Sequence, residues 1–185
     1  MFGVWRRLWA GQHKQKDVVM HVRMATMDDA RTLAELNRDV QQLHADALPE
    51  IYKPVADLTL VTEDFRSRIL GDPAWRTYIV EVDGDPAGYA CARVMRRPEH
   101  VYVYEHEYIY LDQISVRPAY RNSGCGRALM DAVREMAQAA GIRRVALDTM
   151  AFNTGAIMFY ERLGFQMYKH TMHLEWQDER EAGTV

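Results

Sequence analysis

The chain has 185 residues, enough for one domain with a sizeable hydrophobic core. Its hydrophobic share of 48% and charged share of 26% are ordinary for a soluble globular protein, and no apolar run approaches a membrane span. A net charge of −3 lacks the basic excess typical of nucleic-acid binding, and Cys91 and Cys125 suggest no disulfide framework. We therefore expect neither nucleic acid nor membrane as a partner, and a cytoplasmic location.

The first residues differ in composition from the rest. Residues 1–19 combine tryptophans and arginines with a polar stretch. Such a start could touch a membrane surface, but it is short, irregular and without the apolar core of a signal peptide. We interpret residues 1–19 as a disordered or non-native extension, residues 20–177 as the folded domain, and residues 178–185 as a charged tail.

The first part of the domain predicts a strand and two helices. Residues 21–24 favour a strand, and Thr26 with Asp29 forms the capping-box pattern that begins a helix. Its apolar face is expected from residues at helical spacing: Leu33, Leu36, Val40 and Leu43. Two prolines predict an irregular segment over residues 44–54, and a short second helix is expected from Thr62 to about residue 70.

Three strands are predicted next. Residues 77–82 and 87–95 are joined by Asp83-Gly84-Asp85-Pro86, a strong hairpin signal. A longer strand covers residues 108–116 and ends before Pro118, which cannot donate to a sheet ladder. The connection over residues 96–108 mixes tyrosines with glutamates. It could hold a cationic amine, or it could simply be a solvated loop.

A glycine-bearing turn follows the long strand and opens directly into a helix. It reads Arg121-Asn122-Ser123-Gly124-Cys125-Gly126, an R-x-x-G-x-G pattern. Glycines let the backbone curl and leave space for a ligand, and a helix N-terminus offers unpaired N–H groups to phosphate. Arg121 and Arg127 could add charge-assisted hydrogen bonds. Apolar residues at helical spacing continue to Gly141, which is expected to end the helix.

A second motif follows a strand predicted over residues 145–150. It reads Asn153-Thr154-Gly155-Ala156-Ile157-Met158-Phe159-Tyr160-Glu161-Arg162-Leu163-Gly164-Phe165. With R-x-x-G-x-G, this motif resembles the acetyl-CoA-dependent N-acetyltransferases of the GNAT superfamily, over nearly the whole chain from Met20. The resemblance implies an α+β fold, with a mixed central sheet flanked by helices and a splayed central strand pair. Closing strands are expected over residues 165–170 and 172–176.

The resemblance also implies roles for individual residues. Acetyl-CoA would be the co-substrate, with its pyrophosphate at the turn and its pantetheine arm along the end of the long strand. The residues expected to bind it are Ile114, Ser115, Val116, Arg121, Asn122, Ser123, Gly124, Cys125, Gly126, Arg127 and Asn153. Asn153 could instead only cap its helix. Tyr160 stands where the family places the general acid for the departing thiolate, although a core aromatic is the alternative.

A base for the amine is less clearly marked. Asp112 is the carboxylate closest to the place where some relatives keep a glutamate, with Glu105 and Glu107 as alternatives. Strand alternation would put Asp112 on the face that carries Tyr110 and Ile114. A solvated strand carboxylate is the other interpretation. Cys125 has no supporting base at fixed spacing and is not expected to act as a nucleophile, and no residue spacing predicts a metal site.

The sequence therefore predicts transfer of an acetyl group to a primary amine by direct attack within a ternary complex. The acceptor would be a small molecule, a peptide or a protein, and a homodimer is compatible with the resemblance. The alternative is a catalytically silent acyl-CoA-binding regulatory module, which would need the turn but not Tyr160. A P-loop protein does not fit, because no Lys-Ser/Thr follows the second glycine.

Overall fold

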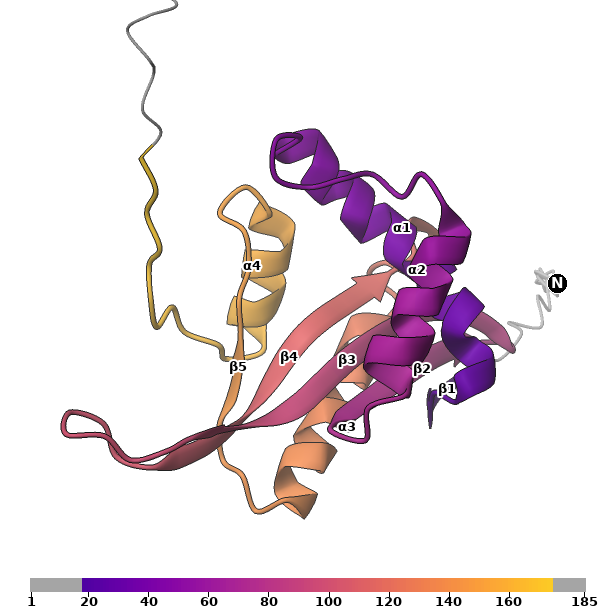
Figure 1. Cartoon of the computed structure of the whole chain (residues 1–185). Helices are drawn as coiled ribbons and strands as arrows, with labels where there is room; N and C mark the ends of the chain where they lie inside the picture. The colour runs from indigo at the N-terminus through magenta and orange to yellow at the C-terminus, as the bar shows by residue number, and fades with distance from the viewer. Residues whose placement is uncertain (1–17, 175–185) are drawn as a thin grey trace, which may run out of the picture. The chain divides into compact units, whose positions relative to one another are not determined.

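A computed structural model describes residues 18–174, which fall into two compact units with a boundary after Asp148. The predicted tail and most of the predicted extension lie outside the described residues. The strands of the first unit are β1 (Met20–Met24), β2 (Trp75–Val82), β3 (Asp85–Arg97), β4 (His106–Val116) and β5 (Val145–Leu147). They form one mixed sheet in the order β1-β2-β3-β4-β5 (Figure 1). All neighbours are antiparallel except β4 and β5, which are parallel.

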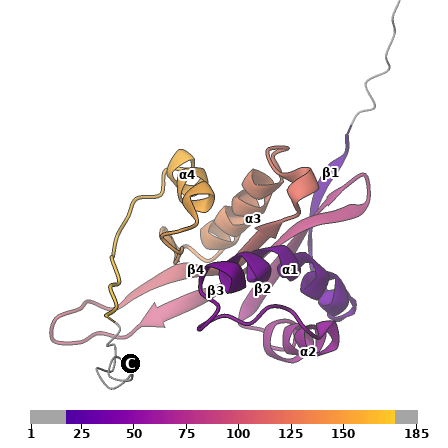
Figure 2. The same ribbon diagram turned by 90° about the horizontal axis from the view of Figure 1, so that it is seen from above.

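Helices cover both faces of this sheet. The helical elements of the first unit are η1 (Met27–Asp29), α1 (Ala30–Ala47), α2 (Leu58–Asp64), the π-helical η2 (Phe65–Leu70), η3 (Pro118–Tyr120) and α3 (Cys125–Ala139). Figures 1 and 2 show α1 and α2 on one face and α3 on the other. This arrangement is the predicted α+β fold. None of the helices among residues 18–174 is both long enough and apolar enough to cross a membrane.

The start of the domain confirms the capping prediction. The Asp29 carboxylate accepts a hydrogen bond from the Thr26 N–H at 2.7 Å and is held by Arg23 of β1 at 2.7 and 2.8 Å. These bonds hold the pKa of Asp29 at about 2, mainly through Arg23. The carboxylate therefore ties the first strand to the turn that begins α1.

Two boundaries differ from the prediction. α1 continues to Ala47, so the irregular segment is shorter than expected. α2 begins at Leu58 rather than at Thr62, because the Asp57 side chain caps it by accepting a hydrogen bond from the Thr59 N–H at 2.7 Å. The Thr62 hydroxyl instead donates to the carbonyl of the preceding turn at 2.8 Å. The helical stretch ends before Gly71, as predicted.

The hairpin between β2 and β3 is tighter than the four-residue signal suggested. Its turn consists of Asp83 and Gly84, with φ of 51° and 90°. A two-residue hairpin turn with positive φ at both positions matches the right-handed twist of the flanking strands. The turn sets the register of the first pairs, Val82 with Asp85 and Glu81 with Pro86, and a bulge at Ala87 then shifts it by one residue.

The core lies on both sides of the sheet. On one face, buried residues of α1, η2, β2 and β3 form one cluster: Leu33, Leu36, Phe65, Ile69, Trp75, Ile79, Tyr89 and Cys91. α3 presents its own buried stripe: Cys125, Leu129, Met130, Val133 and Ala137. Helix periodicity predicted Leu33 and Leu36 of α1 and the α3 stripe correctly, but Leu43, also expected on the apolar face of α1, is 42% exposed.

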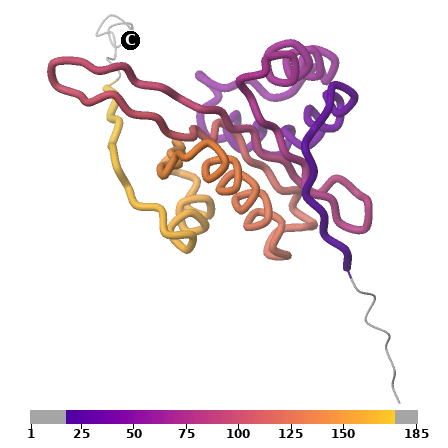
Figure 3. Tube along the Cα trace, turned by 90° about the horizontal axis from the view of Figure 1, so that it is seen from below, coloured from indigo at the N-terminus to yellow at the C-terminus, as the bar shows by residue number. Residues whose placement is uncertain are grey.

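The β3–β4 hairpin extends beyond the rest of the first unit as an arm (Figure 3). Its tip carries exposed aromatic side chains, with Tyr102 and Tyr104 at 90% and 88% exposure. Near its base, Arg96 pairs with Glu107 at 2.6 Å. The loop expected to hold an amine is therefore a solvent-facing arm, and one of its glutamates, Glu107, is already paired with Arg96.

Over residues 149–174, the described part of the second unit, there is one helix, α4 (Thr154–Arg162). The closing strands expected over residues 165–170 and 172–176 are wrong for the part that the structure describes, since residues 165–174 contain no strand. Met167, Tyr168 and Met172 are 61–93% exposed there. Alternating sequence alone does not make a strand, because each strand needs a partner for its main-chain groups.

Candidate active site

A β-bulge interrupts β4 at Asp112. Cys91 of β3 pairs with Gln113 of β4, but the next residue of β3, Ala92, pairs with Leu111. Asp112 is therefore the extra residue on β4, without a counterpart on β3, and it is exposed. A bulge of this kind changes the direction of the strand and resets its side-chain alternation.

Because of the bulge, the prediction of which β4 side chains share a face of the sheet is wrong. Residues directly opposite each other on antiparallel strands share a face. Tyr110 lies opposite Arg93, on the face of Tyr89 and the α1 cluster, whereas Ile114 lies opposite Ala90 on the α3 face. Tyr110 and Ile114 thus point to opposite sides, although strict alternation would have put them together.

Beyond the bulge, one edge of β4 is open. β5 pairs with β4 only at residues 109–111, so the two strands part where β4 continues to Val116. On the other edge, the Arg117 N–H donates to the Ala87 carbonyl at 2.9 Å. Because bonded positions alternate along an antiparallel ladder, Ser115 bonds toward β3 while Ile114 and Val116 direct their N–H and C=O groups to the open edge.

The R-x-x-G-x-G turn lies directly beyond this edge. Asn122 and Gly124 adopt left-handed conformations, with φ of 62° and 95°, and α3 begins at Cys125. Ala128 is the first residue to donate within the helix, to the Gly124 carbonyl, so the preceding N–H groups have no intrahelical acceptor. The Arg121 Nε donates to the Val116 carbonyl at 3.3 Å. The open edge and the helix N-terminus therefore each present free main-chain donors, and the N–H groups of Arg117, Tyr120 and Arg121 between them are already bonded within the chain.

Side chains around the turn serve different purposes. Cys125 is buried in the core, and its Sγ lies 3.2 Å from the Ser123 hydroxyl. The Ser123 hydroxyl also bonds the Tyr120 carbonyl at 2.6 Å, which holds the turn together. Arg121 and Arg127 are exposed, and so are available to an anion.

A polar cluster occupies the α1 face where β4 and β5 part. The Tyr110 hydroxyl donates to the Asp148 carboxylate, just after β5, at 3.0 Å. Burial, this hydrogen bond and the charges of Asp148 and Asp112 raise the pKa of Tyr110 to about 12. Asp112 also adds to the raised pKa of Arg68, which is set chiefly by the hydrogen bond that Arg68 donates to the Asp64 carboxylate. The electrostatic effect of the Asp112 carboxylate is therefore felt on the side of the sheet that α1 and α2 cover.

A buried hydrogen-bond network supports β4 just after the bulge. The Asn37 side chain of α1 donates to the Tyr89 hydroxyl at 2.8 Å, and that hydroxyl donates to the Gln113 side chain at 2.8 Å. Tyr89 is fully buried, so its hydroxyl requires these partners. Sequence reasoning missed this network, because no local pattern connects a helix residue to two strands.

The second unit carries the other predicted site residues. The Asn153 side chain accepts a hydrogen bond from the Ala156 N–H at 3.1 Å and so caps α4. Tyr160 is 9% exposed, and its ring lies 5.3 and 5.6 Å from those of Phe159 and Phe165. Burial raises the pKa of the Tyr160 hydroxyl to about 12, so it keeps its proton at neutral pH.

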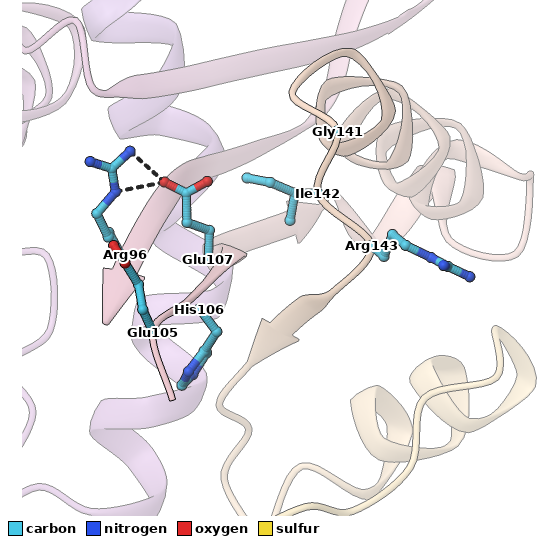
Figure 4. Close-up of a pocket in the computed structure, with 7 residues that line it drawn as sticks. All are labelled: Arg96, Glu105, His106, Glu107, Gly141, Ile142 and Arg143. Atoms are coloured by element: carbon cyan, nitrogen blue, oxygen red, sulfur yellow. Dashed lines mark hydrogen bonds and ion pairs between the residues drawn. The ribbon is translucent and has the colours of Figure 1, made fainter. Parts of the chain in front are cut away.

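A separate cavity of about 550 Å³ lies away from the turn (Figure 4). It is lined by the residues around the start of β4 and those after the end of α3: Arg96, Glu105, His106, Glu107, Gly141, Ile142 and Arg143. The turn joins the opposite ends of these two elements. This places Glu105 and Glu107, the alternative bases, far along β4 from its open edge. Among residues 18–174, no three His, Cys, Asp or Glu side chains group as metal ligands.

The comparison with known proteins agrees with this geometry. Residues 37–165 match the acetyltransferase (GNAT) family. The chain belongs to this family. The match includes the bulge, the open edge, the turn and all of α4. It confirms the resemblance inferred from the two motifs.

Individual relatives within the GNAT family are distant. L-ornithine N5-acetyltransferase of Arabidopsis thaliana is 37% identical over 68 residues, covering 37% of this chain and 28% of the relative. Aminoglycoside N(6′)-acetyltransferase type 1 of Stenotrophomonas maltophilia is 26% identical, covering 87% of this chain and 95% of the relative. The structure of aminoglycoside N-acetyltransferase AAC(6′)-Iy in complex with CoA has a TM-score of 0.68 at 20% identity, covering 89% of this chain and 99% of that one.

Several matches are partial. The chain spans 28%, 38% and 43% of the length of three curated relatives, which include the ornithine enzyme. The likeness to AAC(6′)-Iy, at its low identity, establishes the fold. The GNAT fold with its mixed sheet and parted β4–β5 pair is therefore confirmed.

Proposed function

We propose that this protein transfers the acetyl group of acetyl-CoA to a primary amine, by direct attack within a ternary complex. The observation that carries the proposal is that the open edge at the end of β4 is followed directly along the chain by the turn and the N-terminus of α3. A pantetheine arm, which has peptide-like amides, pairs with an unpaired strand edge. A pyrophosphate binds the N–H groups of a helix N-terminus. The chain offers both in the right order.

The same residues support the placement of each part of acetyl-CoA. Residues 122–127 would hold the pyrophosphate through main-chain N–H groups, with Arg121 and Arg127 adding charge. Ile114 and Val116 would bond the arm through main-chain groups, and Ser115 would hold the strand to β3. An N–H at this edge would also polarise the thioester carbonyl, which is where negative charge develops during transfer. Acetyl-CoA supplies the activated acetyl group.

The chemistry requires two proton movements. The neutral amine forms a bond from its nitrogen to the acetyl carbon, the carbon–sulfur bond breaks, and its electron pair goes to sulfur. One proton leaves the amine and one arrives at the thiolate. We assign the second to Tyr160, a buried phenol that is protonated at neutral pH. Asp112, exposed at the bulge, is the carboxylate we assign to receive the first proton through water.

The names of two relatives support small-molecule amines as the acceptors. One relative is named for ornithine and another for aminoglycosides, and both classes carry primary amines. The test combines calorimetric titration with CoA and thiol release from acetyl-CoA in the presence of a panel of amines. We expect micromolar CoA binding and amine-dependent thiol release. CoA binding without release for any acceptor would instead favour a silent acyl-CoA-binding module, and absence of CoA binding would refute both.

A further inference from the structure

Arg93 of β3 is an arginine with an incomplete set of partners. Its guanidinium lies over the Trp75 ring, with Cζ 4.6 Å from the ring centroid. Its Nε is buried without a hydrogen-bond partner. Among residues 18–174, no carboxylate lies within ion-pair distance of Arg93, in contrast to Arg23, Arg68 and Arg96. The buried Nε cannot reach a ligand, but the terminal nitrogens of a guanidinium fixed by stacking are well suited to a carboxylate.

The surroundings of Arg93 belong to the acceptor side of the proposed site. It lies directly opposite Tyr110, so the two side chains share the α1 face of the sheet. The Tyr110 hydroxyl is bonded to Asp148, and Asp112 follows at the bulge. A cationic group and two carboxylates thus lie on one face, where β4 and β5 part. Such a face is complementary to a molecule that carries both a carboxylate and an amine.

The spacing of these groups limits the size of that molecule. Ala90, opposite Ile114, lies three residues along β3 from Arg93, which corresponds to about 10 Å of strand. An extended diamino acid with a hydrogen bond at each end covers a distance of this order. Its α-carboxylate would reach Arg93 while its side-chain amine approached the open edge. A simple amino acid is too short for both contacts.

We propose that the acceptor is a diamino acid of the lysine or ornithine type, with its α-carboxylate held by the terminal nitrogens of Arg93 and its side-chain amine acetylated. This inference rests on the proposed function and adds the acceptor class. The transfer is the one described above: the side-chain nitrogen gains the acetyl group, and CoA leaves with the sulfur electron pair and a proton. The products are an N-acetylated side chain and free CoA.

Matched acceptor pairs test the carboxylate contact. Lysine and cadaverine, like ornithine and putrescine, differ only in the carboxylate. With the full chain and acetyl-CoA, we expect kcat/KM for each amino acid to exceed that of its diamine by at least ~10-fold, as charge-assisted bidentate pairs allow. Arg93→Gln and Arg93→Met should remove this preference by raising KM much more for the amino acids than for the diamines, so that the two classes become similar substrates.

Arg97→Gln is the matched control, since Arg97 is an exposed arginine on the same strand. It should leave the preference intact. Equal rates for amino acids and diamines in the unmodified protein would overturn the proposal. So would an equal loss for both classes in both Arg93 variants, because Arg93 would then act only on stability. If CoA binds but no member of either pair is acetylated, the acceptor class is wrong while cofactor binding stands. If CoA does not bind, the proposed function itself fails.

Discussion

Gly88 offers a sharp test of how closely β3 and β4 must approach at the open end of the site. A Cβ at this position would lie 2.5 Å from the Ser115 carbonyl oxygen and 3.1 Å from the Val116 Cα and Cγ2. Two of these three atoms belong to the backbone of β4, so they cannot move aside as a flexible side chain would. Gly88→Ala should therefore push the end of β4 away from β3.

The expected size follows from overpacking in a closely packed interior. Such substitutions destabilise proteins by about 1–3 kcal/mol. For a chain of this length, 1 kcal/mol corresponds to about 2–4 °C in Tm, so we expect a fall of roughly 3–10 °C. CoA affinity should also weaken, because Val116 directs its main-chain groups to the open edge. Differential scanning calorimetry and CoA titration measure the two effects.

Gly155→Ala is the matched control. The nearest atom to a Cβ there is the Asn153 Oδ1 at 4.0 Å, and the backbone is not left-handed. Alanine should be neutral or stabilise α4 by about 0.4–1 kcal/mol, because it restricts the unfolded chain. If Gly88→Ala melted at the same temperature as Gly155→Ala, the close approach of β3 and β4 would not be a constraint and the reasoning would be refuted.

Three other substitutions address the site and the start of the domain. Tyr160→Phe should lower kcat at least ~10-fold with unchanged CoA affinity. Tyr168→Phe, at a 93%-exposed position, should leave kcat unchanged. Full turnover in Tyr160→Phe would show that Tyr160 is only a core residue. Gly126→Asp should abolish CoA binding in calorimetry, because the added carboxylate repels the pyrophosphate, while the circular dichroism spectrum stays native. Unchanged CoA affinity would contradict the assignment of the turn to the pyrophosphate. Asp29→Asn should lower the free energy of unfolding by about 2 kcal/mol at pH 7. Since the folded pKa of Asp29 is lowered from 3.8 to about 2, this difference should be present above about pH 4 and fade as pH falls toward 2.

Local signals in the sequence predicted much of the fold correctly. The Thr26–Asp29 cap, the Asp83-Gly84 turn and the stop at Gly141 each depend on residues a few positions apart. Gly141 has a φ of 69° just after α3, where an alanine-like residue would be strained. The family followed from two motifs whose residues are close in sequence. Such local structures and motifs can be predicted from the sequence because the interacting groups are neighbours along the chain.

The errors concern relations between distant segments. The faces of β4 could not be derived from alternation, because the bulge at Asp112 is defined only by its pairing with β3. The Arg93–Trp75 contact joins two residues 18 positions apart on neighbouring strands, and nothing in the pattern marks the arginine as unpaired. The expected closing strands depended on a partner strand rather than on their own sequence. Asp57 as a cap was the one missed feature with a local signal.

The bulge also explains how one strand can serve two partners. Before it, Ile109 directs its N–H to β5, where it bonds the Arg144 carbonyl at 2.9 Å. Without the extra residue, odd-numbered residues would keep facing that edge, and Ser115 rather than Ile114 and Val116 would point there. The insertion reverses this phase just where β5 departs. The same residue that shifts the main chain is Asp112, so a single irregularity places both the carboxylate that we propose as proton acceptor and the main-chain groups that we propose as thioester donors. Deleting Asp112 should therefore abolish cofactor binding and catalysis together, whereas Asp112→Asn should lower turnover and keep CoA affinity. Loss of CoA affinity in Asp112→Asn would show that the carboxylate, and not the bulge, shapes the edge.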